Sequence, residues 1–347
     1  MADLDFNSRT LTQTVSQVKP VGNFILKTFF NDESFSDTKY VDVVIKKGGR
    51  KVAPFVSPKL AGKVIKRDGK VLKTYEPPLM KPKFITEAEE LLNTDTVFYA
   101  DNSDPEERAM LKLAEDLADG KDRIARRKEL MCVSALVDGK IIVKGDGVEE
   151  EIDFGRDAQN TKILTGSALW TDEGSDPIND LKTWSDYLFD KSGIAPDKVV
   201  FGRDVANAFT AHAKVQDAMD KKRIDIGEIN PKKLEDGVVY IGYLKELNLE
   251  IYKYVDYYEN DEGVSTLIMP GDKLIMGSDR AGGKIAHGGI VDFKAFKAAG
   301  MDTNIFVGDI FVKSYEENDP SVRFLVFQSK PLPLPGDVDS YLSAKVV

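Results

Sequence analysis

The sequence predicts an α+β fold, in which helices and strands occupy separate stretches of the chain rather than alternating βαβ units. Three observations predict it: a long helical pattern over residues 105–137, hairpin patterns on both sides of that helix, and a mixed region of short helices and strands after it. The composition is that of a globular protein, since 42% of the 347 residues are hydrophobic and the mean hydropathy is -0.29. A chain of this length predicts two or three domains, or one elaborate one, with a core that needs no disulfide.

Residues 1–40 are expected to form an N-terminal arm. Little periodic pattern is present before the apolar cluster of Phe24–Leu26, Phe29 and Phe30, which predicts one short helical or anchoring segment. Such an arm has no core of its own. We therefore expect a neighbour, in the same chain or in another, to cover its aromatic side chains.

Charge is distributed unevenly along the chain. The net charge of -10 and the isoelectric point near 5.0 argue against a general nucleic-acid binder. Between Val43 and Lys83, however, twelve lysines and arginines face two acids, a local net charge of +10, so the remainder carries -20. This asymmetry predicts that the basic segment contacts an acidic surface.

The basic stretch 41–85 is expected to be an extended β-hairpin. Lys63–Arg67 and Lys70–Tyr75 flank Asp68-Gly69, and an Asp-Gly pair between two β-prone runs is a strong hairpin signal. Two strands alone are too thin to be stable. The hairpin should therefore lie on other structure.

The boundaries of the long helix are marked by local signals. Asp104 is a favourable N-cap, Pro105 suits the first helical position, and Glu107 completes a capping-box pattern. Gly139 is a stop signal at the other end.

The apolar stripe of this helix recurs every seven residues, at Met110, Leu117, Ile124 and Met131. Lys121 and Lys128 interrupt the stripe, which favours a helix packed along a sheet over a coiled coil. Gly120 is expected to bend it.

The rest of the chain predicts short elements. Residues 140–143 and 151–154 flank Gly145–Gly147 and predict a second hairpin. One helix is expected from Pro177 until Gly193, and another, capped by Asp204, to about Met219. Strands are expected over 199–201, 237–243, 249–258, 264–269, 273–276, 304–313 and 322–328, before a proline-spaced tail.

Few residues suggest catalysis. His212 lies inside the expected helix 205–219 and His287 in the glycine-rich stretch 282–289. No Gly-x-Ser-x-Gly elbow accompanies either, so a hydrolase has little support. The single cysteine, Cys132, excludes a disulfide within the chain and a cysteine-rich zinc site, and we expect it to be a buried thiol in a reducing compartment.

Two further stretches resemble sites only superficially. Gly277–Lys284 fails as a phosphate-binding loop, because Gly283 stands where lysine is needed and Ile285 where serine or threonine is needed, so a glycine-rich surface loop is expected. Glu149–Glu151 is interpreted as a solvated strand edge, since residues in a strand alternate between faces. No catalytic residue, metal site, cofactor or membrane partner is therefore expected.

Short motifs along the chain resemble, in order, the lambda-like phage major capsid protein E family. They are Phe55–Pro58, Gly62–Ile65, Lys81–Lys83, Val133–Leu136, Ile152–Arg156, Val200–Gly202, Ala208–Phe209 and Gln328–Leu332. Each motif is weak alone, but their order and spacing make the set specific.

The resemblance implies the Hong Kong 97-type phage capsid fold. Its parts would be the N-arm at 1–40, the extended E-loop at 41–85, a P-domain at 86–175 with a spine helix at about 105–137, an A-domain at 176–300, and C-terminal strands at 301–347 that return to both domains. It implies a major capsid (head) protein of a tailed bacteriophage and no enzyme.

The resemblance also implies partners and a location. Copies of the chain would form pentamers and hexamers of an icosahedral shell around the genome. A scaffolding protein, a portal, a decoration protein and double-stranded DNA, bound without sequence specificity, would be the partners. The place would be the virion capsid, after synthesis and assembly in the cytoplasm of the bacterial host.

We expect the E-loop to supply the assembly interface by lying over an acidic surface of the neighbouring subunit. The residues expected there are Arg50, Lys63, Lys66, Arg67, Lys70 and Lys73. Three alternatives stay open: an encapsulin-like nanocompartment shell, a hydrolase that uses His212 or His287, and a nucleic-acid-binding module that uses the basic hairpin.

Overall fold

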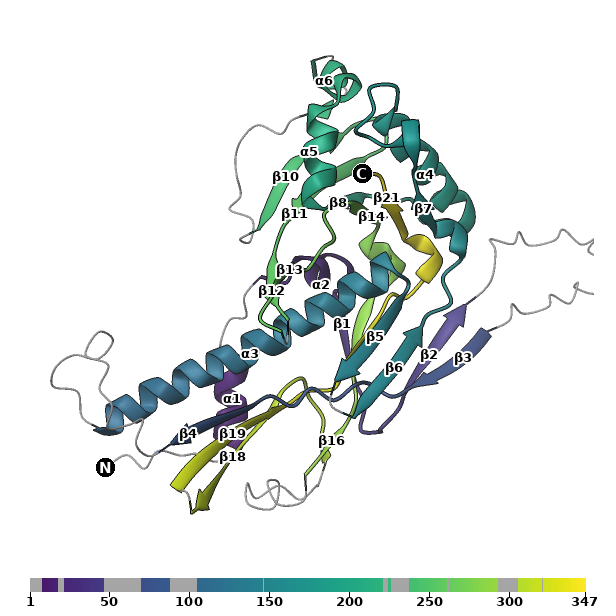
Figure 1. Ribbon diagram of the computed structural model, residues 1–347. Helices are drawn as coiled ribbons and strands as arrows, with labels where there is room; N and C mark the ends of the chain where they lie inside the picture. The colour runs from purple at the N-terminus through teal and green to yellow at the C-terminus, as the bar shows by residue number, and fades with distance from the viewer. Residues whose placement is uncertain are drawn as a thin grey trace, which may run out of the picture.

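The computed structural model describes residues 8–17, 22–46, 70–87, 105–145, 147–220, 224–225, 237–260, 262–292, 305–319 and 321–347. Within these ranges helices and strands are mixed without regular βαβ alternation, which confirms the α+β prediction. Figure 1 shows one long helix, α3, crossing the molecule between a group of helices and strands above it and narrower β-ribbons below it.

Helix α3 spans Pro105–Val137, the range expected from the sequence. At 1.5 Å per residue it is about 50 Å long. Its buried Leu117 and Ile124 pack with Phe327 of β19 (Ser321–Gln328), which pairs with β18 (Phe311–Asn318) and β4 (Lys83–Glu87) in a three-stranded sheet. A Cβ at Gly120 would lie 2.4 Å from the Phe327 ring. Gly120 thus lets the ring approach the helix backbone, which is a packing role that the sequence did not predict.

The two lysines that interrupt the apolar stripe of α3 are buried and bind partners on other segments. Lys121 Nζ donates a hydrogen bond to the carbonyl of Val15 at 2.7 Å, in helix α1 (Ser8–Gln17). Lys128 forms an ion pair with Asp309, in the connection before β18. Both lysines therefore fasten other segments to the helix, and α3 packs along a sheet as predicted.

The N-terminal segment is covered within its own chain. It contains α1, α2 (Phe24–Phe29) and β1 (Asp32–Phe35), and Ile25, Phe29 and Phe30 are buried. Strand β1 pairs in parallel with β15 (Lys284–His287), whose other neighbour is β20 (Pro331–Leu334). The expected anchoring segment is confirmed as α2, and a helix and a strand accompany it.

A seven-stranded sheet forms the second large unit. Its order is β7 (Thr161–Ile163), β21 (Leu342–Lys345), β14 (Lys273–Gly277), β8 (Lys198–Phe201), β11 (Leu249–Tyr254), β10 (Val238–Leu244) and β9 (Ile224–Asp225). Helices α4 (Pro177–Ser192), α5 (Arg203–Ala211) and α6 (Ala213–Asp220) pack on it around a core that includes Trp170, Phe201 and Phe209. Figure 1 shows these helices at the end of the molecule away from β18 and β19.

Four two-stranded ribbons complete the described strands. They are β2 (Val41–Lys46) with β3 (Lys70–Tyr75), β5 (Lys140–Gly145) with β6 (Val148–Asp153), β12 (Tyr257–Glu259) with β13 (Ser265–Leu267), and β16 (Ile290–Val291) with β17 (Ile305–Phe306). The hairpin expected around Gly145–Gly147 is confirmed, since Gly145 pairs with Val148 across two turn residues.

Three expected elements are divided. The strand expected over 304–313 is one of them, since β17 ends at Phe306 and β18 begins at Phe311. The helix expected to reach Met219 is broken at His212, whose backbone is extended (φ -70°, ψ 129°) and whose ring Nδ1 accepts the backbone N–H of Lys214 at 3.3 Å. Gly202, rather than Asp204, is the N-cap of α5. The strand expected over 249–258 is interrupted between β11 and β12, where the N–H of Val255 donates to the carbonyl of Gly237.

The glycine-rich surface loop expected over Gly277–Lys284 is confirmed in its middle. Asp279–Ala281 form a 3-10 turn, and Arg280 and Gly282 are exposed, whereas Gly277 ends β14 and Lys284 begins β15. Strand β15 lies in the middle of its sheet and is largely buried. At Gly283 a Cβ would meet the carbonyl oxygen of Phe29 at 2.1 Å, so only glycine fits this close approach. The proline-spaced tail also forms strands. β20 is an edge strand, where the missing proline N–H is tolerated, and β21 lies inside the large sheet.

Candidate assembly surface and its anchoring contacts

The base of the expected E-loop is the β2–β3 ribbon. Its pairs run from Val41 opposite Tyr75 to Lys46 opposite Lys70. The partner that the structure gives to Lys70–Tyr75 is thus β2. The pairing expected with Lys63–Arg67 lies outside the described residues.

The six expected interface residues are only partly covered by the structure. Arg50, Lys63, Lys66 and Arg67 lie outside the described residues, and Lys70 is the first residue of β3. Lys73 contacts its own chain, since its Nζ donates to the carbonyl of Asp153 at 3.1 Å.

Tyr75 binds the same carbonyl of Asp153. Its hydroxyl donates at 2.6 Å, and its ring meets that of Phe154 nearly edge-on, with the centroids 6.2 Å apart. The end of β6 therefore holds β3 at two neighbouring side chains, Lys73 and Tyr75. This anchoring holds the end of β3 against the end of β6.

Arg156 closes the C-terminal end of α3. Its Nη2 donates to the carbonyl of Val137 at 2.7 Å and to Thr161 Oγ1 at 2.8 Å, and its Nη1 donates to the carbonyl of Leu136. The guanidinium group thus supplies hydrogen-bond donors to carbonyls that have no partner within the helix. Its positive charge also interacts favourably with the helix dipole. Gly139, with φ at +70°, makes the turn next to it.

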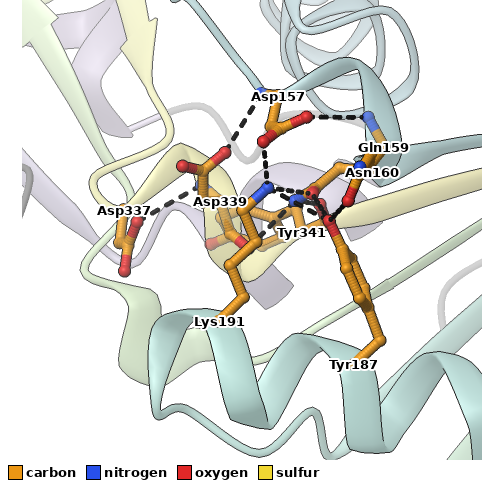
Figure 2. Close-up of polar contacts among 8 residues, drawn as sticks. All are labelled: Asp157, Gln159, Asn160, Tyr187, Lys191, Asp337, Asp339 and Tyr341. Atoms are coloured by element: carbon orange, nitrogen blue, oxygen red, sulfur yellow. Dashed lines mark hydrogen bonds and ion pairs between the residues drawn. The ribbon is translucent and has the colours of Figure 1, made fainter. Parts of the chain in front are cut away.

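Asn160 is the centre of the polar network drawn in Figure 2. Its side chain is fully buried. Its Nδ2 donates to the carbonyls of Asp339 at 3.0 Å and Tyr341 at 2.9 Å. Its Oδ1 accepts from Tyr187 Oη at 3.0 Å and from Lys191 Nζ at 3.1 Å. One amide thus joins the segment before β7, helix α4 and the segment before β21.

Charged groups surround this amide. Lys191 Nζ lies 2.6 Å from Asp157 Oδ2, and this contact holds the pKa of the Asp157 carboxyl below its ordinary value. The backbone N–H of Asp157 donates to Asp339 Oδ1 at 3.1 Å, and that of Asp339 donates to Asp337 Oδ1 at 3.2 Å. These groups bind one another, which indicates a structural role for the network (Figure 2).

Glu129 fastens the N-terminal arm to α3. Its buried carboxylate accepts the N–H of Ile25 at 2.7 Å and that of Leu26 at 2.9 Å, in the first turn of α2. These N–H groups have no partner within the helix, so the carboxylate satisfies them. Burial raises the pKa of Glu129 to about 7.

Asp309 contacts three other segments of the chain. It pairs with Lys128 of α3, and its Oδ1 lies 3.5 Å from Nδ1 of the buried His287 in β15. The ring of Phe35, in β1, stacks on His287 with the centroids 4.9 Å apart. Ser329 Oγ donates to the Asp309 carbonyl at 2.7 Å. Burial lowers the pKa of His287 to about 4.

The geometry at His212 is unsuited to a general base. Its Nδ1 accepts the N–H of Lys214, so its proton is on Nε2, which lies 3.1 Å from Ser175 Oγ and 3.3 Å from the carbonyl of Asp172. Ser175 Oγ itself donates to that carbonyl at 2.8 Å. His212 therefore donates toward the serine, whereas a catalytic histidine accepts the serine proton.

The other candidate sites are also accounted for by packing. Cys132 is fully buried, as expected, and burial raises the pKa of its thiol well above the ordinary value. Gly277–Lys284 leads into strand β15, whereas a phosphate-binding loop opens a helix. Glu149 and Glu151 pair with Lys144 and Lys140, which confirms the solvated edge.

No group of three or more histidine, cysteine, aspartate or glutamate side chains in the described residues is placed to hold a metal ion. None of the helices formed by these residues is long and apolar enough to cross a membrane.

Sequence reasoning did not identify Asn160, Glu129 or Asp309. Lys128 carried a usable signal, since a lysine buried inside an apolar stripe needs a polar or acidic partner. Asn160 carried none, because its partners follow it by 27 and 31 residues in α4 and by about 180 residues before β21.

The chain is similar to phage capsid proteins in sequence. The family model described as phage major capsid protein E matches residues 7–346. The major capsid protein of Escherichia phage N15 is 28% identical over 330 residues, 92% of this chain and 93% of that protein. The major capsid protein of Escherichia phage lambda is 26% identical over 328 residues, with the same coverage. That of Enterobacteria phage P21 is 24% identical over 352 residues, 98% of this chain and 99% of that protein.

Solved structures show the same fold. A prophage protein of Escherichia coli CFT073, assigned as a capsid protein, superposes with a TM-score of 0.75 at 20% identity and covers 98% of this chain and 99% of its own. A phage-related protein of Bordetella bronchiseptica RB50 gives a TM-score of 0.55 at 14% identity, over 97% of this chain and 96% of its own.

Proposed function

Since this chain belongs to the phage major capsid protein E family and serves as a major capsid protein of a tailed bacteriophage, we propose that its copies assemble as pentamers and hexamers into an icosahedral shell around the genome. The observation that carries the proposal is the family match over residues 7–346, nearly the whole chain. The fold is of the Hong Kong 97 type, and the place of the protein is the virion capsid.

We assign the parts of that fold as follows. The N-arm is residues 1–40, the E-loop 41–85, the P-domain 86–175 with α3 as its spine helix, the A-domain 176–300, and the returning C-terminal strands 301–347. The pairing of β21 inside the seven-stranded sheet and the packing of α3 against β18 and β19 support this assignment.

The proposed assembly contact is the basic E-loop of one subunit on an acidic surface of the next. The segment Val43–Lys83 carries +10 and the remainder -20, so the two surfaces are complementary on one chain. Such complementarity produces head-to-tail contacts, which close into rings or shells. Each exposed ion pair between subunits contributes only about 0–1 kcal/mol to their association. Many repeated pairs are therefore needed to fix the arrangement of the subunits in the shell. The contacts of Lys73 and Tyr75 with Asp153 support a loop whose base is held rigidly.

The proposed partners during assembly are a scaffolding protein, a portal and a decoration protein, in the cytoplasm of the bacterial host. Double-stranded DNA would be enclosed without sequence-specific contacts. The excess of acidic residues supports a wall that repels DNA and lets it move during packaging.

The encapsulin-like alternative has the weaker support. The relatives similar over 92% of this chain are phage major capsid proteins, which favours a phage head. The family match over residues 7–346 likewise favours a capsid protein over a nucleic-acid-binding module that uses the basic hairpin.

The test is charge reversal in the E-loop. Lys66→Glu with Arg67→Glu should give soluble monomers or small oligomers by size-exclusion chromatography and negative-stain electron microscopy, while the unchanged chain gives shells. Lys182→Glu, an exposed reversal on α4, is the control and should assemble normally. Shells at the unchanged yield from the E-loop variant would overturn the proposed contact.

A further inference from the structure

A groove lies beside α3, between that helix, β5 and residues 78–82. Its volume is about 780 Å³, and an adjoining hollow of about 500 Å³ shares Arg123, Arg127, Leu130 and Tyr258 with it. The apolar side chains of Leu79, Ile142 and Val148 line it, and they are 49%, 55% and 48% exposed. Exposed apolar side chains that line one groove mark an interaction surface.

The edges of this groove are basic. Lys81, Arg123, Arg126, Arg127 and Lys144 line the two hollows, against the acids Asp119 and Glu259. Arg123 binds Asp119 at 2.9 Å and Lys144 binds Glu149 at 3.4 Å, so both are paired. Among the described residues, no hydrogen bond or ion pair reaches Arg126 or Arg127.

The tip of the β18–β19 hairpin is acidic, in contrast to the basic edges of the groove. Asn318 pairs with Ser321, so two residues make the turn, and Glu316, Glu317 and Asp319 are all exposed. Glu316 binds Arg323 at 2.9 Å, whereas Glu317 and Asp319 have no ion pair or hydrogen bond within the described part of the chain. Tyr315, 40% exposed, adds an aromatic side chain close to the tip.

We propose that the β18–β19 tip of one copy docks into the groove beside α3 of the next copy, with Glu317 and Asp319 facing Arg126 and Arg127. The tip and the groove are complementary in charge, and the apolar floor suits a side chain such as Tyr315. The inference rests on the proposed function, because it names a second contact between copies of the chain.

The contact is between copies because the hairpin cannot turn back on its own groove. β19 is held by β4 on its other edge, and α1 packs on β18. Figure 1 shows the free ends of β18 and β19 pointing away from β5 and β6. A projecting tip and a distant groove on one chain produce a head-to-tail contact, the kind that closes into rings.

A second copy fits the groove better than DNA does. Phosphates need cations but gain nothing from the apolar side chains of Leu79, Ile142 and Val148 on the floor. Charge pairs at such a site set the register and choice of partner more than the affinity.

The test is a charge swap. Arg126→Glu with Arg127→Glu, and separately Glu317→Lys with Asp319→Lys, should each lower the shell yield about tenfold, and the two pairs combined should restore most of it. Yield is measured by size-exclusion chromatography and electron microscopy. Lys182→Glu and Glu173→Lys, exposed reversals outside both surfaces, are the matched controls. Circular dichroism of the unassembled variants establishes that each is folded.

Each result separates the hypotheses. Absence of shells from the unchanged chain would overturn the proposed function itself. Normal shells from the unchanged chain and from both reversed pairs would overturn only this contact. Two defective pairs that do not rescue each other would also overturn it. The contact would also be overturned if the arginine variant formed normal shells that bound less of a double-stranded DNA oligonucleotide. Arg126 and Arg127 would then bind DNA and not a second copy of the chain.

Discussion

Asn160 should be the polar residue whose loss most weakens the junction between α4, β7 and β21. Asn160→Ala removes two donors, one to the partly buried carbonyl of Asp339 and one to the buried carbonyl of Tyr341, and an acceptor shared by Tyr187 and Lys191. A typical hydrogen bond contributes about 1 kcal/mol, and a buried group left without a partner costs about 1–3 kcal/mol. The two side-chain donors still bind each other at 3.1 Å, so they lose less than the carbonyls. We expect a loss of roughly 3 kcal/mol in the free energy of unfolding.

Two further variants separate the effect of losing a hydrogen-bond donor from the effect of losing side-chain volume. Asn160→Asp keeps the shape but places a carboxylate against two carbonyl oxygens, so it should be at least as destabilising as alanine. Tyr187→Phe removes one donor and should cost about 1 kcal/mol.

Urea unfolding of the unassembled chain measures these differences. Trp170 and Trp184 stack with centroids 6.1 Å apart in the core beside α4, so their fluorescence reports on this region. An Asn160→Ala variant within about 0.5 kcal/mol of the unchanged chain would refute the role assigned to the network.

Three other predictions concern α3 and its neighbours. Because the pKa of Glu129 is raised to about 7 from 4.5, its contribution to stability is full below about pH 4.5 and falls as the pH rises to about 7. Glu129→Gln lacks this pH dependence. The difference in unfolding free energy between the unchanged chain and the variant, measured in urea, should therefore change by up to about 3 kcal/mol between acidic and neutral pH. A difference that stays constant with pH would contradict the prediction. His287 should behave oppositely, since its pKa is lowered to about 4 from 6.5: stability falls as the pH drops through this range, and His287→Leu should abolish that fall in the same assay. Gly120→Ala should lower stability by about 1–3 kcal/mol despite the better helix propensity of alanine, because its Cβ meets Phe327; a higher melting temperature for this variant would disprove the packing role.

Elements with local signals were predictable from the sequence. Helix α4 begins after Asp176, whose side chain accepts the N–H of Asn179, and ends at Gly193 with φ at +73°. The turn between β5 and β6 is likewise determined by the residues within it. In both cases the chemistry that sets the boundary lies within a few residues of it.

Elements that depend on distant partners were not predictable. Strand β15 exists because β1 and β20 lie on its two sides, and Gly283 is needed there only because Phe29 approaches it. His212 breaks a helical pattern because its ring binds Ser175 and Lys214, which a propensity argument does not include. The polar network follows the same rule, since Asn160 binds carbonyls near the C-terminal strand.

The measurement that tests the central claim most directly is negative-stain electron microscopy of the purified protein, with size-exclusion chromatography beside it. The account predicts uniform shells, tubes or hexamer-sized rings from this chain. A protein that stays strictly monomeric, even under crowding and with a candidate scaffolding protein, would contradict it.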